Sequence, residues 1–317
     1  MAPRKMTGHI TLALDAGQTG IRTLLQHDGS RVDGGYPGLR TDAELFAQLA
    51  TVIVDSLAGH VGPVSLSVGM TGLTAANSKP AALLALLPDQ VERVFLAHDS
   101  VTGFLGSIGL GEGVMTAVGT GVVTLGVGAS SIARVDGWGN LIGDAGSAYW
   151  IGRAGLESGM RAYDGRLESP ALLSLVTDNF SHPEEAYIDL QTSSDRVARV
   201  ASFARAVIEL AEHDDVAADI VRTAGRELAM SALAAARRVG LVEHVRTGKD
   251  ERGPRFSWTG NVMKSDLLRE TFIAEVFAAV PTAVLAPPVA EPVDGVALLE
   301  HVPNDSPLQA AIHEARR

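Results

Sequence analysis

Residues 10–26 read ITLALDAGQTGIRTLLQ, an apolar run that a glycine-rich DAGQTG segment separates from a second apolar run. Residues 114–127, VMTAVGTGVVTLGV, have the same form around a central GTG. Each stretch predicts a strand, a tight turn and a returning strand. A further turn and a third short run follow each of them, at residues 31–34 and 132–135. The sequence therefore predicts one three-stranded unit that occurs twice.

The bulk composition limits the class of protein. The chain has 317 residues, of which 46% are hydrophobic, enough for two medium-sized cores. A net charge of −11 argues against a duplex nucleic-acid partner. Cysteine is absent, which excludes disulfides, thiolate metal sites and iron–sulfur clusters. The first apolar run is too short for a signal peptide and no stretch approaches 18 apolar residues, so we expect a cytoplasmic protein without a membrane partner.

The two halves continue differently after the repeated unit. In the first half, a capping-box pattern at 41–44 predicts the start of a helix, and apolar runs at 64–70 and 94–97 predict buried strands. The second half becomes mostly helical, with long helices expected at 148–161 and 214–238. This order predicts an α/β fold with mixed sheets, divided near residue 99.

The two glycine-rich turns are candidate phosphate sites. Asp15, at the end of a buried strand, is placed to hold a hydrated Mg²⁺. An ordinary hairpin is the alternative for the first turn alone, but the second copy favours phosphate binding. Two such turns would supply two sets of backbone N–H groups to one nucleotide. The candidate residues are Gly17, Gln18 and Thr19 in the first turn and Gly119, Thr120 and Gly121 in the second.

Two aspartates end apolar segments and are candidates for chemistry. Asp99 follows a buried strand and is a candidate general base for an attacking hydroxyl; the alternative is a helix cap. Strand alternation turns the neighbouring His98 to the other face, so we expect it to be structural. Asp144 precedes a helix and is expected to cap it, to contact substrate, or both.

Two further segments are weaker candidates. Trp138, which lies between glycines, would suit a wall against a sugar ring or a place in the core. Gly260 and Asn261 form a turn after an apolar strand and could pass under an adenine ring. The common nucleotide P-loop, the Rossmann glycine motif, the zinc-protease HExxH and the hydrolase GxSxG are all absent from the sequence.

The most specific pattern is residues 136–153, DGWGNLIGDAGSAYWIGR. It resembles the Gly-Trp-Gly, Gly-Asp-Glu-Gly-Ser and Tyr-Trp-Ile-Gly motifs of the BadF/BadG/BcrA/BcrD group, and specifically its N-acetylglucosamine kinase-like proteins. These belong to the actin-like ATPase superfamily. Both glycine-rich turns, Asp99 and the Gly260 turn fall in the order of that family's motifs, so the resemblance covers nearly the whole chain.

The resemblance implies two ribonuclease-H-like domains with a central cleft that clamps ATP and Mg²⁺. It implies an N-terminal domain of residues 1–98 plus 293–317 and a C-terminal domain of residues 99–292 with a helical insertion. Asp99 would be the catalytic base, Asp15 the metal residue, and Gly260 and Asn261 adenosine contacts. The sugar would be bound by Thr71, Gly72, Trp138, Gly139 and Asp144.

Three positions depart from the family pattern. Ala145 stands where the family usually has Glu, and the loop 34–40 lacks the family's sugar-contacting Asn. Asn261 replaces the second Gly of the adenosine motif. The absence of cysteine excludes the branch that activates dehydratases through an iron–sulfur cluster.

The expected function is an ATP-dependent kinase for the 6-hydroxyl of an amino sugar, N-acetylglucosamine or glucosamine. Two alternatives stay open: an ATPase that drives a partner protein, and a non-catalytic sugar or nucleotide sensor on the same fold. The expected partner is a small sugar, and the resemblance is compatible with a homodimer.

Overall fold

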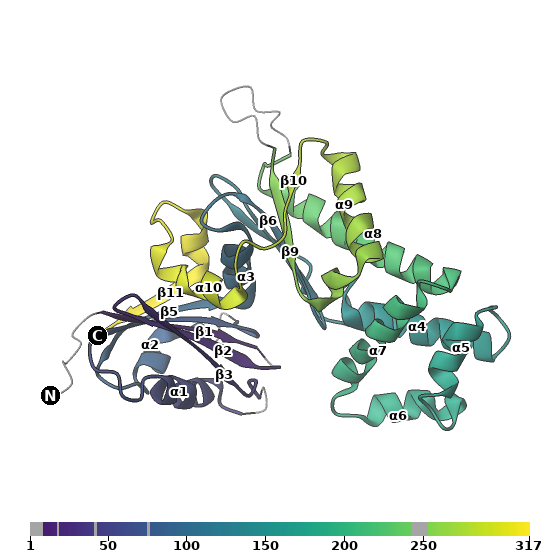
Figure 1. Cartoon of the computed structure of the whole chain (residues 1–317), viewed down its shortest axis with the longest axis horizontal. Coiled ribbons are helices and arrows are strands. Elements are labelled where there is room, and N and C mark those ends of the chain that lie inside the picture. Colours follow the sequence, from purple (N-terminus) through teal and green to yellow (C-terminus); the bar gives the residue numbers. More distant parts are fainter. Residues whose placement is uncertain (1–8, 18, 41–42, 75–76, 243–252) are drawn as a thin grey trace. The chain divides into compact units, whose positions relative to one another are not determined.

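The chain folds into two compact units, each built on one sheet (Figure 1). The computed structural model describes residues 9–17, 19–40, 43–74, 77–242 and 253–317. Unit 1 comprises residues 1–112, 129–132 and 288–317, and unit 2 comprises residues 113–128 and 133–287. The predicted domain limits, 1–98 plus 293–317 and 99–292, stay a prediction.

Unit 1 contains a six-stranded sheet in the order β11-β5-β4-β1-β2-β3. Strands β1, β4 and β5 run parallel, whereas β2, β3 and β11 run antiparallel to their neighbours. Every residue of β4 is buried, as expected for a strand covered on both faces. The strands are β1 (Ile10–Ala16), β2 (Ile21–His27), β3 (Ser30–Tyr36), β4 (Val64–Met70), β5 (Val91–His98) and β11 (Ile312–Arg316).

The helices of unit 1 cover this sheet. Helix α3 (Asp99–Ile108) packs on α10 (Pro292–Ala297), and the remaining helices are α1 (Leu45–Ser56), α2 (Pro80–Leu84), η3 (Leu299–His301) and η4 (Pro307–Ala311). Helix α1 begins with Glu44 as its N-cap, so the capping box predicted from residue 41 is wrong. The Gln48 side chain instead binds both the N–H and the carbonyl of Arg40, each at 2.9 Å, and so fixes the chain that enters the helix.

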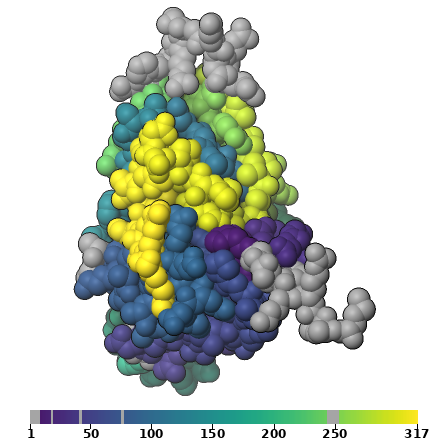
Figure 2. All heavy atoms as spheres, turned by 90° about the vertical axis from the view of Figure 1, so that its left-hand side faces the viewer, coloured from purple at the N-terminus to yellow at the C-terminus, as the bar shows by residue number. Residues whose placement is uncertain are grey.

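The C-terminal strand completes the sheet of unit 1. Strand β11 pairs with β5 along its whole length, from Ile312 opposite Ala97 to Arg316 opposite Arg93. Figure 2 shows this segment, in yellow, lying on the surface beside the blue middle of the unit. The Arg93 guanidinium bonds Glu314 at 2.9 Å, which adds a side-chain link to the backbone pairing.

Unit 2 repeats the three-stranded motif of unit 1. Its five-stranded sheet has the order β10-β9-β6-β7-β8, in which β6, β7 and β8 correspond to β1, β2 and β3. As predicted, the glycine-rich turn joins β6 to an antiparallel β7. The strands are β6 (Gly113–Val118), β7 (Val122–Val127), β8 (Ile132–Val135), β9 (Arg255–Thr259) and β10 (Val284–Leu285), and β9 and β10 are parallel to β6.

Helices form the rest of unit 2. Helix α8 packs on β6 and β7, and α9 packs on α8. The helices are α4 (Ala148–Tyr163), α5 (Pro170–Thr177), η1 (Pro183–Glu185), α6 (Ala186–Thr192), α7 (Arg196–Leu210), α8 (Asp215–Arg238), η2 (Asn261–Lys264) and α9 (Asp266–Ala279). The sequence predicts Ser265 as the cap of α9, and it does cap this helix by accepting the N–H of Leu268. The sequence also predicts a polar loop at 246–253, which lies almost wholly outside the described residues. No described helix is long and apolar enough to cross a membrane.

Helix α4 is held unusually close to its neighbours. A Cβ added at Gly152 would lie 2.0 Å from the carbonyl of Val200 on α7, and one at Gly159 would lie 2.5 Å from the carbonyl of Leu172 on α5. Real Cβ atoms do not approach backbone so closely, so only glycine fits at these positions. The close approach fixes α4 against α5 and α7.

Candidate functional site

Three parallel strands of unit 1 end at one edge of the sheet with polar residues. Asp15 is the last residue but one of β1, Thr71 follows β4, and Asp99 follows β5. The register aligns Asp15 with Gly69 and Met70 with His98, so β4 separates the two aspartates by one strand. Ligands of α/β sheets bind at the carboxyl ends of parallel strands, which makes this edge the candidate site of unit 1.

The first glycine-rich turn is closed by its own backbone. The N–H of Gly17 donates to the carbonyl of Gly20 at 3.0 Å, and the carbonyl of Gly17 accepts the N–H of Leu39 at 2.9 Å. The N–H of Thr71 donates to the carbonyl of Ala16 at 3.1 Å and ties the end of β4 to this turn. Thr19 is exposed, whereas Gln18 lies outside the described residues.

The surroundings of the Asp15 carboxyl group disfavour its charged form. Burial, reinforced by the charge of Asp99, raises its pKa to about 6, against a smaller opposing effect of Arg22. A bound cation would relieve both causes, because it would neutralise the two carboxylates together. The donor set is chemically suited to Mg²⁺, which prefers oxygen ligands and keeps part of its water shell.

Asp99 begins helix α3 but does not cap it. The cap is His98, whose Nδ1 accepts the N–H of Ser100 at 3.1 Å. The same Nδ1 lies 2.8 Å from Oδ1 of Asp99, and that oxygen is buried without a hydrogen-bond partner among the described residues. An Nδ1 that accepts a hydrogen bond has no proton to donate in the neutral ring. The contact between His98 Nδ1 and Asp99 Oδ1 is therefore attractive when a proton lies between these two atoms.

This contact corrects the expected position of His98. Strand alternation predicts that it points away from Asp99, but β5 ends at His98 and α3 begins at Asp99. The change of backbone conformation at this junction brings the two side chains together. A histidine directly before a candidate base at a strand end was the available signal in the sequence.

The second glycine-rich turn has the same closing bond as the first. The N–H of Gly119 donates to the carbonyl of Gly121 at 2.9 Å. The carbonyls of Gly119 and Thr120 accept the N–H groups of Ala148 and Tyr149, at 3.0 and 3.1 Å, from the first turn of α4. The turn is thereby fixed on the start of a long helix, with its backbone exposed at Gly119 and Thr120.

The side chain of Asp144 packs against this turn at Gly121. It is 7% exposed, and a Cβ added at Gly121 would lie 2.7 Å from its Oδ2, so the turn needs glycine there. Burial raises the pKa of Asp144, while N–H groups of Val122 and Gly139 that bind the carboxylate oppose the shift. The helix cap is Ser147, which accepts the N–H of Trp150 at 3.2 Å, so the capping alternative for Asp144 is wrong.

The loop before α4 is ordered by a second aspartate. Oδ1 of Asp136 accepts the N–H groups of Gly137 and Asp144, both at 2.8 Å. Trp138 is 58% exposed, with the Arg134 guanidinium 5.2 Å from its ring centre, so it is not a core residue. Gly139 is also exposed. In unit 1, Gly72 is exposed beside Thr71 after β4.

The turn after β9 lies beside the turn after β6. Gly260 has a φ of +103°, and a Cβ there would lie 2.0 Å from the carbonyl of Val118, the last residue of β6. Asn261, exposed, begins η2. Unit 2 thus brings the candidate adenosine contacts and the second phosphate turn to one edge of its sheet.

A family model describes most of this chain. The model of the BadF/BadG/BcrA/BcrD ATPase family matches residues 50–299, which include Asp99, both turns of unit 2 and the loop before α4. The chain belongs to the BadF/BadG/BcrA/BcrD ATPase family. The match supports the resemblance inferred from the sequence.

Relatives of this ATPase family member include sugar kinases. An N-acetylmuramic acid/N-acetylglucosamine kinase of Clostridium acetobutylicum is 29% identical over 143 residues, which is 44% of this chain and 47% of that protein. The match thus spans about half the length of this curated relative.

Solved structures confirm the predicted two-domain actin-like fold. A proposed N-acetylglucosamine kinase from Chromobacterium violaceum has a TM-score of 0.71 at 21% identity, over 93% of this chain and 99% of that one. A second, from Porphyromonas gingivalis, has a TM-score of 0.70 at 16% identity, over 92% and 98%. The ROK hexokinase of Thermus thermophilus has a TM-score of 0.54 at 15% identity, over 95% and 99%.

Proposed function

We propose that this family member is an ATP-dependent kinase that phosphorylates the 6-hydroxyl of an amino sugar, N-acetylglucosamine or glucosamine. The observation that supports it most is Asp99 directly after β5, where Oδ1 is buried against Nδ1 of His98 while the side chain as a whole stays 39% exposed. The exposed part of this carboxylate is suited to receive a proton, which is what a sugar hydroxyl must lose as it attacks a phosphoryl group.

Asp99 would accept the hydroxyl proton, and His98 would hold the protonated carboxyl. Their 2.8 Å contact would become a hydrogen bond when a proton lies between the two atoms, with Nδ1 bound to that proton in place of the N–H of Ser100. Neutral Asp99 would also remove the like charge beside Asp15.

The two turns would bind the phosphates of ATP. Because Gly17 and Gly119 use their own N–H groups to close the turns, phosphate oxygens would be bound by the N–H groups that follow, at Thr19, Thr120 and Gly121. Asp15 would hold Mg²⁺, which supplies positive charge to the phosphate oxygens when bound. Gly260 and Asn261 would contact adenosine.

The sugar would be bound by exposed groups of both units. Thr71 and Gly72 offer a hydroxyl and backbone at the edge of the first sheet, and Trp138 offers an aromatic face beside Gly139. Asp144 would act chiefly by positioning the Gly121 turn, since its carboxylate binds N–H groups of its own loop. ATP as the phosphoryl donor is consistent with action in the cytoplasm.

The test is release of ADP from Mg-ATP with glucosamine, N-acetylglucosamine, glucose, mannosamine, N-acetylmannosamine or no sugar. We expect turnover that requires an amino sugar and falls in Asp99→Asn. Equal release of ADP with and without sugar would contradict the kinase proposal and favour an ATPase that drives a partner protein. Nucleotide binding without any turnover would instead support a sensor.

A further inference from the structure

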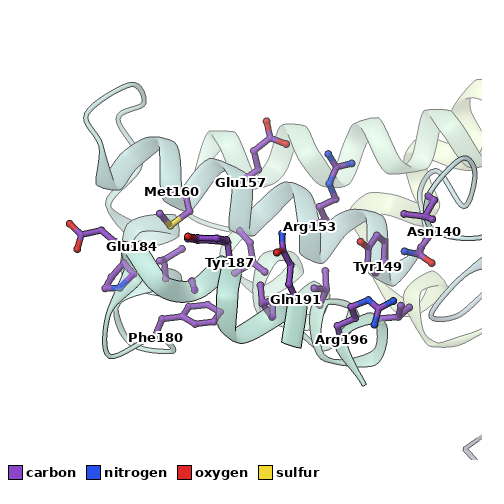
Figure 3. Close-up of a pocket in the computed structure, with 18 residues that line it drawn as sticks. Asn140, Tyr149, Arg153, Glu157, Met160, Phe180, Glu184, Tyr187, Gln191 and Arg196 are labelled. Atoms are coloured by element: carbon purple, nitrogen blue, oxygen red, sulfur yellow. The ribbon is translucent and has the colours of Figure 1, made fainter. Parts of the chain in front are cut away.

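Unit 2 contains a cavity of about 660 Å³ that none of the roles above uses (Figure 3). This volume falls within the roughly 300–1,000 Å³ of small-molecule sites. Its walls come from α4, α6, α7, the end of α5 and η1. Together with Asn140 and Leu141 of the loop before α4, these helices form the cavity within one compact unit.

The cavity has a preformed apolar base. Leu156, Val176, Phe180, Ala186 and Val200 line it and belong to a separate buried cluster of unit 2. Partly buried side chains of Tyr149, Met160 and Leu190 pack on this cluster and also line the cavity. The base would accommodate aliphatic or amide-bearing parts of a ligand without rearrangement.

One end of the cavity adjoins the candidate sugar-binding loop. Asn140 and Leu141, which directly follow Gly139, line it together with Tyr149 of α4. Figure 3 shows Asn140, Tyr149 and Arg196 at this end, and Met160, Phe180 and Glu184 at the other. The N–H of Tyr149 also binds the Gly121 turn through the carbonyl of Thr120. The cavity thus continues directly from the loop to which we assign the sugar.

The basic side chains of the cavity lie toward one of its ends. Four charged side chains line it, two acidic and two basic. Glu157 pairs with Arg161 at 2.8 Å, whereas Glu184, at the end away from Asn140, accepts the uncharged hydroxyl of Tyr163 at 3.1 Å and keeps its charge. Within the part of the chain that the structure describes, the guanidinium groups of Arg153 and Arg196 make no hydrogen bond or ion pair. Figure 3 shows both toward the Asn140 half of the cavity.

We propose that this cavity is a subsite for a carboxylate-bearing branch of the sugar substrate, with Arg153 and Arg196 as its specificity residues. The inference rests on the proposed kinase function, and it deepens the substrate class to acidic amino sugars. A guanidinium binds a carboxylate through paired, charge-assisted hydrogen bonds, and the apolar base accommodates the carbon part of the branch. Neutral amino sugars would leave the cavity to water.

The test compares N-acetylmuramic acid, whose ring carries a lactyl ether, with its methyl ester and with N-acetylglucosamine. The measured quantity is the ratio of kcat/KM for the acid to kcat/KM for the ester, in wild type, Arg153→Met, Arg196→Met and the double variant. Arg205→Met is the matched control, because Arg205 lies on α7 with Arg196, pairs with Glu209 at 2.8 Å and does not line the cavity.

We expect the acid to be preferred by wild type and the ratio to fall about 10–100-fold in the double variant, the effect of a lost hydrogen bond to a charged group. The loss should appear in KM, and calorimetric binding of the acid should weaken equally without ATP. The control should keep the ratio. Turnover of N-acetylglucosamine with no preference for the acid, or an unchanged ratio in the double variant, would overturn this inference and leave the kinase proposal intact. Absence of turnover with every sugar would overturn the kinase proposal itself.

Discussion

The two glycine-rich turns share one backbone design but differ in what lies beneath them. In unit 1, Asp15 is adjacent to the turn and exerts its charge on Asp99. In unit 2, Asp144 lies under Gly121 with its carboxylate bound to backbone N–H groups. In the first arrangement the carboxylate of Asp15 is available to a ligand. In the second, the carboxylate of Asp144 binds backbone N–H groups and so holds the loop in shape. Under the proposed function, the first copy of the duplicated strand–turn–strand unit would serve the chemistry and the second would support the nucleotide.

The largest expected effect is at the candidate base of unit 1. Asp99→Asn keeps the shape of the side chain but removes its capacity to accept a proton. We expect kcat to fall roughly 10²–10⁴-fold, the usual contribution of a general base, with KM for ATP little changed. Steady-state kinetics with the preferred sugar measures this.

Asp305→Asn, at an exposed position of the same unit, is the control and should keep full activity. A loss of tenfold or less in Asp99→Asn would remove Asp99 from the catalytic role.

The charged form of Asp15 in unit 1 should lower the stability of the folded protein. Because the pKa of Asp15 is raised from 3.8 to about 6, the folded state binds this proton more tightly than the unfolded chain. Its stabilising contribution is present below about pH 4 and is lost as pH rises through 6, by about 3 kcal/mol. Asp15→Asn should therefore raise the melting temperature of the ligand-free protein at pH 8 and change it less at pH 4.

Thermal unfolding at both pH values, without nucleotide and Mg²⁺, checks this expectation. The same variant should lose Mg-ATP turnover, so that stability and activity move in opposite directions. A melting temperature at pH 8 equal to or below that of wild type would contradict the raised pKa.

Steric substitutions distinguish the two turns. Gly121→Ala introduces a Cβ only 2.7 Å from Oδ2 of Asp144, whereas Gly119→Ala meets nothing nearer than 4.0 Å. We expect Gly121→Ala to destabilise the protein by about 1–3 kcal/mol, the usual cost of overpacking, and to raise KM for ATP. Gly17→Ala in unit 1 meets only an ordinary contact at 3.4 Å and should resemble Gly119→Ala in stability.

Chemical denaturation of the three variants tests this difference. Equal stability of Gly121→Ala and Gly119→Ala would show that Asp144 can move aside, and that the second turn does not depend on it.

The smallest expected effect belongs to His98. An asparagine at this position can still accept the N–H of Ser100 and cap α3, but unlike histidine it has no basic nitrogen that could take up a proton from Asp99. We expect His98→Asn to lower kcat about tenfold with little change in unfolding free energy. His98→Ala should show the same kinetic loss and also lose about 1 kcal/mol of stability, because the cap is gone.

Kinetics and denaturation of both His98 variants give the readout. Unchanged kcat in both variants would mean that His98 only caps the helix.

The sequence was sufficient for features that depend on local pattern. The repeated strands, the glycine-rich turns and the position of Asp99 after β5 follow from alternating apolar residues and the breaks between them. The side-chain geometry required the structure. The contact of His98 with Asp99 depends on the strand-to-helix junction, and the burial of Asp144 depends on a glycine 23 residues earlier in the chain. The cavity depends on how several helices and the loop before α4 pack together, which no local pattern specifies.

Helix α4 connects the second glycine-rich turn of unit 2 with the cavity. Its first two N–H groups bind the carbonyls of Gly119 and Thr120 in the second glycine-rich turn, and its later turns form a wall of the cavity. Its 16 residues span about 24 Å, and the contacts at Gly152 and Gly159 prevent it from bending locally. One rigid element therefore forms both a wall of the cavity and the support of the turn. If a ligand in the cavity changed the affinity of the turn for its own ligand, the reverse effect would have to be equal.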